Sequence, residues 1–131
     1  MADTTTNSTH AAIAERVIGS IVQAGAPVLS PDGTQVAFVV TRVDMTENRY
    51  VSQVWLASTD GITPPRPVTS GEHDGNPTFS PDGRTLVFTS RRSERKGDAT
   101  LHALPVDGPG ETRTLASMPD GIDSPVVSPD G

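Results

Sequence analysis

The tetrapeptide Ser-Pro-Asp-Gly occurs three times in this chain, and the copies begin 50 and 48 residues apart. Nearly constant spacing of one motif indicates a structural repeat. Proline presets φ near −65°, aspartate hydrogen-bonds nearby backbone, and glycine adopts a positive φ, so each copy predicts a tight turn between antiparallel strands. The predicted turn residues are Ser30, Pro31, Asp32 and Gly33; Ser80, Pro81, Asp82 and Gly83; and Ser128, Pro129, Asp130 and Gly131.

Strand-like segments recur in the same order between these turns. TQVAFVVT follows the first turn and RTLVFTS the second, which places Phe38 and Phe88 at equivalent positions. Each unit then continues with YVSQVWLAS or ATLHALPV and with RPVT or ETRTLA, and APVL, NPTF and SPVV precede the three turns. Four short strands in a unit of about 40–50 residues are typical of a β-propeller blade. A two-layer sandwich would not explain identical turns at a fixed period.

The predicted fold class is therefore all-β, an incomplete β-propeller with two four-stranded blades, the first strand of a third and a short N-terminal helix. We expect a disordered N-terminus over 1–10, the helix over 11–22, blade 1 over 26–73, blade 2 over 74–121 and a truncated blade 3 over 122–131. Closed propellers need about 4–8 blades, because closure removes exposed sheet edges. We therefore expect this chain to be the beginning of a longer protein.

Two segments depart from the repeat. The helix is predicted because Ile13, Val17 and Ile21 fall on one helical face, and Gly25 ends the pattern. The connection over 41–50 is three residues longer than its counterpart in the second unit, and predicts an extended hairpin end.

Composition excludes several functions. Sixteen acidic and ten basic residues give a net charge of −6, which disfavours nucleic-acid binding because phosphates require a cationic face. Without cysteine there is no disulfide, no thiolate zinc site and no thiol nucleophile. The longest apolar run has five residues, far short of the roughly 20 of a membrane helix, and the N-terminus lacks a secretory signal. We expect a cytoplasmic protein without membrane or nucleic-acid partners.

No catalytic motif is present. The sequence lacks Gly-x-Ser-x-Gly, His-Glu-x-x-His, a P-loop and a dinucleotide-binding glycine pattern. We therefore expect this chain to hold no catalytic residue, cofactor or metal. The run Glu72-His73-Asp74 lies in a glycine-bounded connection, where a structural or solvent-exposed loop is the favoured interpretation over a catalytic pair.

Three other candidates also receive structural interpretations. His102 occupies the repeat position of Trp55, which predicts packing on a strand. Asp44, Glu47 and Asn48 suggest calcium ligation, but Arg49 stands where an EF-hand loop requires glycine. The basic cluster is interpreted as a charged, solvated turn. Its members are Arg91, Arg92, Arg95 and Lys96.

The stretch APVLSPDGTQVAFVVTRVDMTENRYVSQVWLAS resembles the first blade of the prolyl oligopeptidase family of serine peptidases, in its acylaminoacyl-peptidase and dipeptidyl-aminopeptidase branch. RVDMTENRY followed by VWL is the most specific part. GNPTFSPDGRTLVFTSRR and LHALPVDG resemble the next blade, so the resemblance covers about residues 11–131. One small departure is Gly108-Pro109-Gly110-Glu111, where the family often has Gly-Gly-Glu.

The resemblance implies a parent enzyme in which an N-terminal propeller gates access to a Ser-Asp-His site. That site lies in a C-terminal α/β-hydrolase domain, which is absent from these 131 residues, so no catalytic residue carries over. The implied activity is cleavage of short peptides, with acylaminoacyl or dipeptidyl release. The implied partners are peptide substrates and the hydrolase domain.

Two alternatives remain open. The first is a non-enzymatic binding propeller, similar to the TolB-type periplasmic proteins that share this repeat. Those proteins are exported, whereas this N-terminus carries no export signal. The second is a stand-alone fragment that forms a homo-oligomer to cover its open sheet edges.

Overall fold

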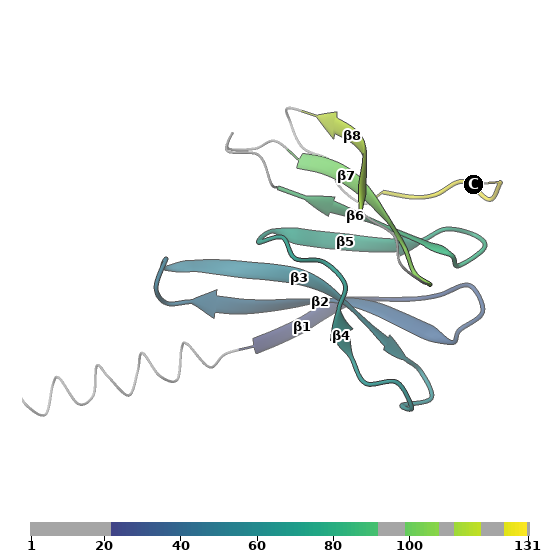
Figure 1. The fold of residues 1–131 in the computed structure, drawn as a ribbon, viewed down its shortest axis with the longest axis horizontal. Helices are drawn as coiled ribbons and strands as arrows, with labels where there is room; N and C mark the ends of the chain where they lie inside the picture. Colours follow the sequence, from purple (N-terminus) through teal and green to yellow (C-terminus); the bar gives the residue numbers. More distant parts are fainter. Residues whose placement is uncertain (1–21, 92–98, 108–111, 119–124, 131) are drawn as a thin grey trace, which may run out of the picture.

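The computed structural model describes residues 22–91, 99–107, 112–118 and 125–130. These residues form eight β-strands in two antiparallel four-stranded sheets, and they contain no helix (Figure 1). Within each sheet the strands are arranged in chain order, so that neighbouring strands are consecutive in the sequence. The expectation of an all-β fold built from two four-stranded blades is confirmed.

Blade 1 comprises β1 (Val22–Leu29), β2 (Gln35–Asp44), β3 (Arg49–Ser58) and the two-residue β4 (Arg66–Pro67). The β2–β3 hairpin is long because its pairing continues to Asp44 and Arg49. The connection over 41–50 thus extends the two strands and projects beyond β4, which is the extended hairpin expected from the repeat offset (Figure 1).

Blade 2 comprises β5 (Asp74–Phe79), β6 (Thr85–Ser90), β7 (Ala99–Pro105) and β8 (Arg113–Met118). The sequence repeat is preserved in the strand register. Phe38 lies opposite Trp55 in blade 1, and Phe88 lies opposite His102 in blade 2.

The first strand begins earlier than the repeat predicts. Residues 11–21 of the expected helix lie outside the described residues, but Val22, its last predicted residue, belongs to β1 and pairs with Arg42. That assignment was wrong at Val22 because the extended β2 offers strand partners beyond the length of an ordinary blade. Residues 1–10 also lie outside the described part.

The segment expected to open a third blade has no strand partner among the described residues. An innermost strand pairs with the second strand of its own blade, and no such strand follows Pro125–Asp130 in the described part. This segment instead approaches the innermost strands of both blades, where Pro125 and Val126 line a cavity of about 320 Å³ with residues of β1 and β5, among them Pro27 and Pro77.

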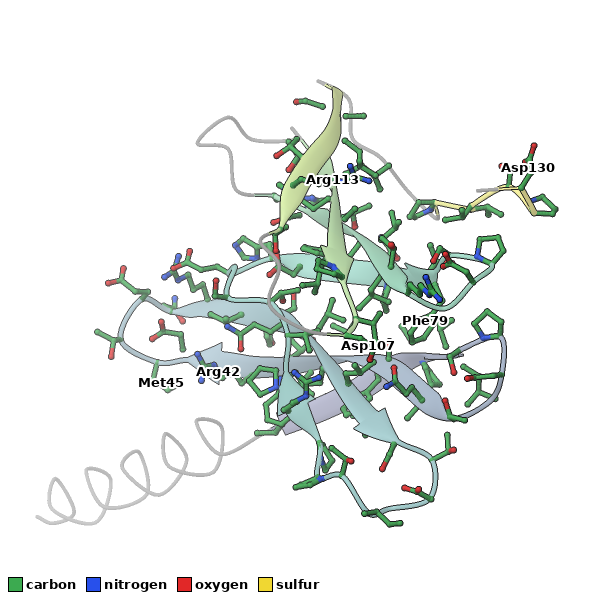
Figure 2. The ribbon with its side chains drawn as sticks, turned by 45° about the vertical axis from the view of Figure 1, so that its right-hand side comes forward. Arg42, Met45, Phe79, Asp107, Arg113 and Asp130 are labelled. Carbon is green, nitrogen blue, oxygen red and sulfur yellow. The ribbon has the colours of Figure 1, made fainter. Side chains whose placement is uncertain are left out.

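One hydrophobic core joins the two sheets. Figure 2 shows Phe79 between them. The buried members are Ala37, Val54 and Leu56 from blade 1 and Phe79, Leu86, Phe88 and Val106 from blade 2. Full burial of one such apolar side chain stabilises the fold by about 1.5–3 kcal/mol, so the sheets are held together chiefly by this interface. Within the described part, no helix is long and apolar enough to span a membrane.

Candidate functional site

The Ser-Pro-Asp-Gly turns have the same geometry in both blades. In the first, the Gly33 amide donates to the Ser30 carbonyl at 2.9 Å, and the Ser30 hydroxyl donates to Asp32 at 2.7 Å. The second repeats these bonds at 2.8 and 2.6 Å, from Gly83 and Ser80. Each serine hydroxyl also accepts an amide from the following strand, at 3.0 Å. The motif thus fixes the strand separation at each hairpin.

The turn aspartates are ionised acceptors. Hydrogen bonds from the Ser30 hydroxyl and then from Thr34 lower the pKa of Asp32, and those from Ser80 and Arg84 lower the pKa of Asp82. In the third copy, the Ser128 hydroxyl donates to Asp130 at 2.8 Å and lowers its pKa in the same way. All three carboxylates accept hydrogen bonds within their own turns, which is a structural role.

Gly33 offers a clean test of the turn because its φ is +72° and the space beside its Cα is open. Gly33→Ala should destabilise the protein by about 1–2 kcal/mol, since only the backbone conformation opposes the added Cβ. The free energy of unfolding measures the effect. Gly25→Ala is the matched control, because Gly25 also has open space but no positive φ, and it should change stability by under about 0.5 kcal/mol. Equal effects at both positions would contradict this account of the turn.

The run Glu72-His73-Asp74 connects the blades. The Glu72 carbonyl accepts the Ser52 amide at 2.8 Å, and the His73 carbonyl accepts the Arg91 amide at 3.1 Å. Asp74 is 1% exposed and accepts from the Ser90 hydroxyl at 2.5 Å and the Gly71 amide at 2.8 Å. The backbone and the buried carboxylate therefore tie blade 1 to blade 2, which is a structural role.

Arg49 is a site residue that the sequence reasoning used only to exclude calcium. Its guanidinium binds the Glu72 carboxylate through two hydrogen bonds of 2.5 and 2.7 Å, and Asp44 lies 3.9 Å away. The hydrogen bonds to Glu72 raise the pKa of Arg49 further above its ordinary value. The pair joins the extended hairpin to the blade connection, although its exposure to solvent screens the attraction between the two charges. No sequence signal links two positions 23 residues apart.

Both innermost strands carry a bulge at the same repeat position. The register shifts between Gly25 and Val28 in β1 and between Gly75 and Thr78 in β5. The residue before each proline has a positive φ, 52° at Ala26 and 50° at Asn76. Such a φ is uncommon outside glycine, and a following proline disfavours it further. In the sequence, the signal for these two bulges is the Gly-x-Pro pattern that both units share.

A cavity of about 370 Å³ lies beside these bulges. Its lining residues are Gln23, Gly25, Ala26, Val39, Thr41, Ser52, Asp74, Gly75 and Asn76. The Asp74 carboxylate and the Asn76 amide, which donates to Thr89 at 3.1 Å, already have partners. The described residues around this cavity therefore provide polar groups for contact, and they include no nucleophile paired with a general base.

The remaining candidates have structural surroundings. His102 is 6% exposed, stacks on Phe88 with ring centroids 5.5 Å apart, and contacts the Thr100 and Thr114 hydroxyls through its two ring nitrogens. Asp44 accepts the amides of Thr46 and Glu47 at 3.1 and 3.3 Å.

The basic cluster falls largely outside the described residues. Arg91 is exposed, whereas Arg92, Arg95 and Lys96 lie in the segment over 92–98 that the structure does not describe. Among the described positions, no three His, Asp or Glu side chains gather as a metal site would require.

Comparison with known proteins identifies a curated relative. The chain is 40% identical over 118 residues to the uncharacterized peptidase YuxL of Bacillus subtilis (strain 168). The match includes 87% of this chain but only 17% of that protein's length. No family model matches the chain.

Two solved structures share the fold. The acylaminoacyl peptidase of Pyrococcus horikoshii superposes with a TM-score of 0.64 at 15% identity, over 79% of this chain and 16% of its own. The β-propeller domain of the Trilobed protease from Pyrococcus furiosus, described as an open velcro topology, gives 0.63 at 19% identity, over 77% and 29%. These likenesses establish the propeller architecture that the repeat predicted.

Proposed function

We propose, on the premise that this chain belongs to the propeller portion of the prolyl oligopeptidase family, that it forms the first two propeller blades of a serine peptidase. The observation that carries the proposal is the 40% identity to a peptidase across 87% of the chain. Relatedness at that level extends to function more readily than a shared fold does, because one fold hosts many functions. The hydrolytic site belongs to the part of the parent protein that these residues do not contain.

The topology supports a gating role for the propeller. In a four-stranded antiparallel blade, the first strand begins and the fourth ends on the same face of the ring. β1 begins on this face, together with the extended β2–β3 hairpin and the connection from blade 1 to Asp74. A domain joined to both ends of a complete propeller therefore sits over this face. Substrate then enters past the propeller, and a narrow entrance selects short peptides over folded proteins.

The proposed reaction is hydrolysis of short peptides with release of an acylaminoacyl or dipeptidyl unit. A Ser-Asp-His triad in an α/β-hydrolase domain supplies the nucleophile, the general base and its orienting carboxylate. The two blades hold no part of this triad. They contribute a rigid wall, because the shared core and the Asp74 hydrogen bonds fix one blade against the other.

The test uses the full-length gene product that contains this chain. It should hydrolyse N-acetyl-alanyl-p-nitroanilide or a dipeptidyl-p-nitroanilide, and a serine-directed fluorophosphonate should abolish the activity. A folded protein with the same peptide bonds should stay intact, whereas short synthetic peptides with the sequence of its N-terminus should be hydrolysed. Hydrolysis of neither chromogenic substrate, together with no fluorophosphonate labelling, would contradict the proposal and favour a binding propeller.

A further inference from the structure

The cavity of about 370 Å³ at the seam between the blades is lined on one side by a row of polar residues. Gln23 lies opposite Thr41, and Thr41 lies opposite Ser52, on the neighbouring strands β1, β2 and β3. Residues directly opposite each other in antiparallel strands project from the same face of the sheet. Blade 1 thus presents an uncharged polar row toward β5, which lies beside these three strands.

The polar row begins where the hydrophobic core ends. Val54 is 0% exposed and belongs to the core, and Ser52, two residues earlier in β3, already lines the cavity. Thr41 occupies the repeat position of Arg91, and Ser52 that of Ala99. The row is therefore specific to the longer strands of blade 1 and is not a general feature of the repeat.

Glycines from both blades leave room in this cavity. Gly25 and Gly75 line it at equivalent repeat positions, and a Cβ added to either would meet no other part of the molecule within 4 Å. Because β1 and β5 are the first strands of their sheets, their outer edges have no strand partner among the described residues. The volume falls within the range of about 300–1,000 Å³ for small-ligand sites. A ligand here can approach both side chains and backbone groups.

The lining has hydrogen-bonding capacity that the described residues do not use. In the described part of the chain, the side chains of Gln23, Thr41 and Ser52 have no hydrogen-bond partner. The Asn76 side chain donates to Thr89 at 3.1 Å, which leaves its Oδ1 as an acceptor. Hydroxyls and amides both donate and accept. The cavity therefore offers several donors and acceptors to a polar ligand.

The lining also defines the charge of this ligand. Asp74 is the one ionisable side chain among the nine described lining residues, and its carboxylate already accepts hydrogen bonds from Gly71 and Ser90. A carboxylate or a phosphate would therefore enter beside a negative charge and meet no cation in this lining. A neutral chain of alternating N–H donors and C=O acceptors fits the lining, and the peptide backbone is such a chain.

We propose that this cavity binds the uncharged backbone of an extended peptide segment, at a site separate from the hydrolytic centre. The inference rests on the proposed function, in which the hydrolase domain sits over the face where β1 begins. The cavity lies at that end of the blades, since Gln23 is the second residue of β1 and Asp74 is the first of β5. An extended hexapeptide is about 20 Å long, so only a longer substrate has residues to place here.

Calorimetric titration of the full-length protein with the uncharged hexapeptide acetyl-Ala-Ser-Gly-Ala-Ser-Gly-amide measures this binding. Prior treatment with a fluorophosphonate prevents hydrolysis during the titration. Thr41→Val combined with Ser52→Ala should weaken the affinity at least about fivefold, because the pair removes two hydroxyls and little volume. Thr46→Val combined with Ser117→Ala is the matched control: it removes two exposed hydroxyls outside the cavity and should change the Kd by less than about twofold.

Photocrosslinking locates the peptide on the wild-type protein, and it decides the matter if the Thr41 and Ser52 double variant does not fold. The same hexapeptide with p-benzoylphenylalanine in place of its fourth residue should attach to residues 39–41 or 74–76, as identified by mass spectrometry. A hexapeptide with aspartate in place of both serines should compete at least about fivefold less well than the uncharged one. Crosslinks confined to residues outside the cavity, or equal competition by the aspartate peptide, would overturn the proposal.

Hydrolysis separates a binding role from a structural one. In the active enzyme, Thr41→Val combined with Ser52→Ala should raise the KM for the hexapeptide at least about fivefold. The kcat/KM for N-acetyl-alanyl-p-nitroanilide, which is too short to occupy the cavity, should stay unchanged. A parallel loss with both substrates would overturn the proposal, because it would show a general effect on the enzyme.

The outcomes also distinguish this site from the proposed function. Equal affinity of the two double variants, in an enzyme that hydrolyses its chromogenic substrate, would overturn the peptide site and leave the peptidase proposal intact. Weaker peptide binding only in the cavity variant, in a protein that neither hydrolyses these substrates nor takes up a fluorophosphonate, would support the site and overturn the peptidase proposal.

Discussion

Phe88→Ala is expected to lower the free energy of unfolding of the two-blade unit by about 3–5 kcal/mol, the range for removing a buried phenylalanine. Phe88 is 0% exposed, stands in the core between the sheets, and stacks on His102. Alanine would lose the transfer free energy of the ring and leave a cavity bounded by strands of both blades. Backbone hydrogen bonds fix the strands within each sheet, so the sheets cannot collapse to fill this cavity.

Native-state hydrogen exchange of β6 and β7 amides in the full-length protein measures this change. Ile62→Ala is the matched control, since it also removes apolar carbon but at a side chain that is 81% exposed, and it should cost under about 0.5 kcal/mol. Phe88→Leu should recover more than half of the loss, because leucine refills most of the volume. An effect of Phe88→Ala no larger than that of Ile62→Ala would show that the interface between the blades does not stabilise the unit.

Asp74→Ala is expected to destabilise the unit by about 2–4 kcal/mol. Its carboxylate accepts from the Gly71 amide and the Ser90 hydroxyl in a site that is 1% exposed, and hydrogen bonds to a charged group contribute about 1.5–3 kcal/mol each before losses overlap. Alanine would remove the acceptor that the Gly71 amide and the Ser90 hydroxyl share. The loss should concentrate at the junction, where amides of Gly71, Ser90 and Arg91 should exchange faster.

Two further variants test whether the effect arises from the Asp74 carboxylate itself. Asp107→Ala removes an exposed carboxylate at the end of β7 and should change stability by under about 0.5 kcal/mol. Gly71→Ala should resemble Asp74→Ala, because a Cβ on Gly71 would collide with the Asp74 carboxylate and displace it. Wild-type exchange at the junction in Asp74→Ala would contradict the role given to this residue.

Most of the fold could be predicted from the sequence repeat. Identical turns predicted hairpins, and matching offsets placed His102 at the position of Trp55, which the register of β6 and β7 bears out. These features are local or periodic, so they leave a mark in one sequence. The boundary at Val22 was missed because its strand partner, Arg42, belongs to a hairpin extension that is specific to blade 1.

The residues of the blade junction were much harder to predict. Glu72 and His73 lie in the connection between the blades, as expected, whereas Asp74 begins β5, and the sequence could not distinguish the buried Asp74 from the exposed Glu72. Ser90 and Gly71 donate hydrogen bonds to the Asp74 carboxylate, whereas Arg49 binds the Glu72 carboxylate. These donors come from three separate segments of the chain. Tertiary convergence of this kind has no periodic signal. The positive φ at Ala26 and Asn76 was also missed, because proline ordinarily disfavours it in the preceding residue, although both units share a Gly-x-Pro pattern there.

The central claim is that these blades belong to a longer serine peptidase. The most direct test is the intact mass of the full-length gene product that contains this chain, recorded before and after treatment with a fluorophosphonate. The account predicts a mass several times the 13.7 kDa of this chain, and an increase by one inhibitor adduct after treatment. A product of 13.7 kDa that takes up no adduct would contradict it.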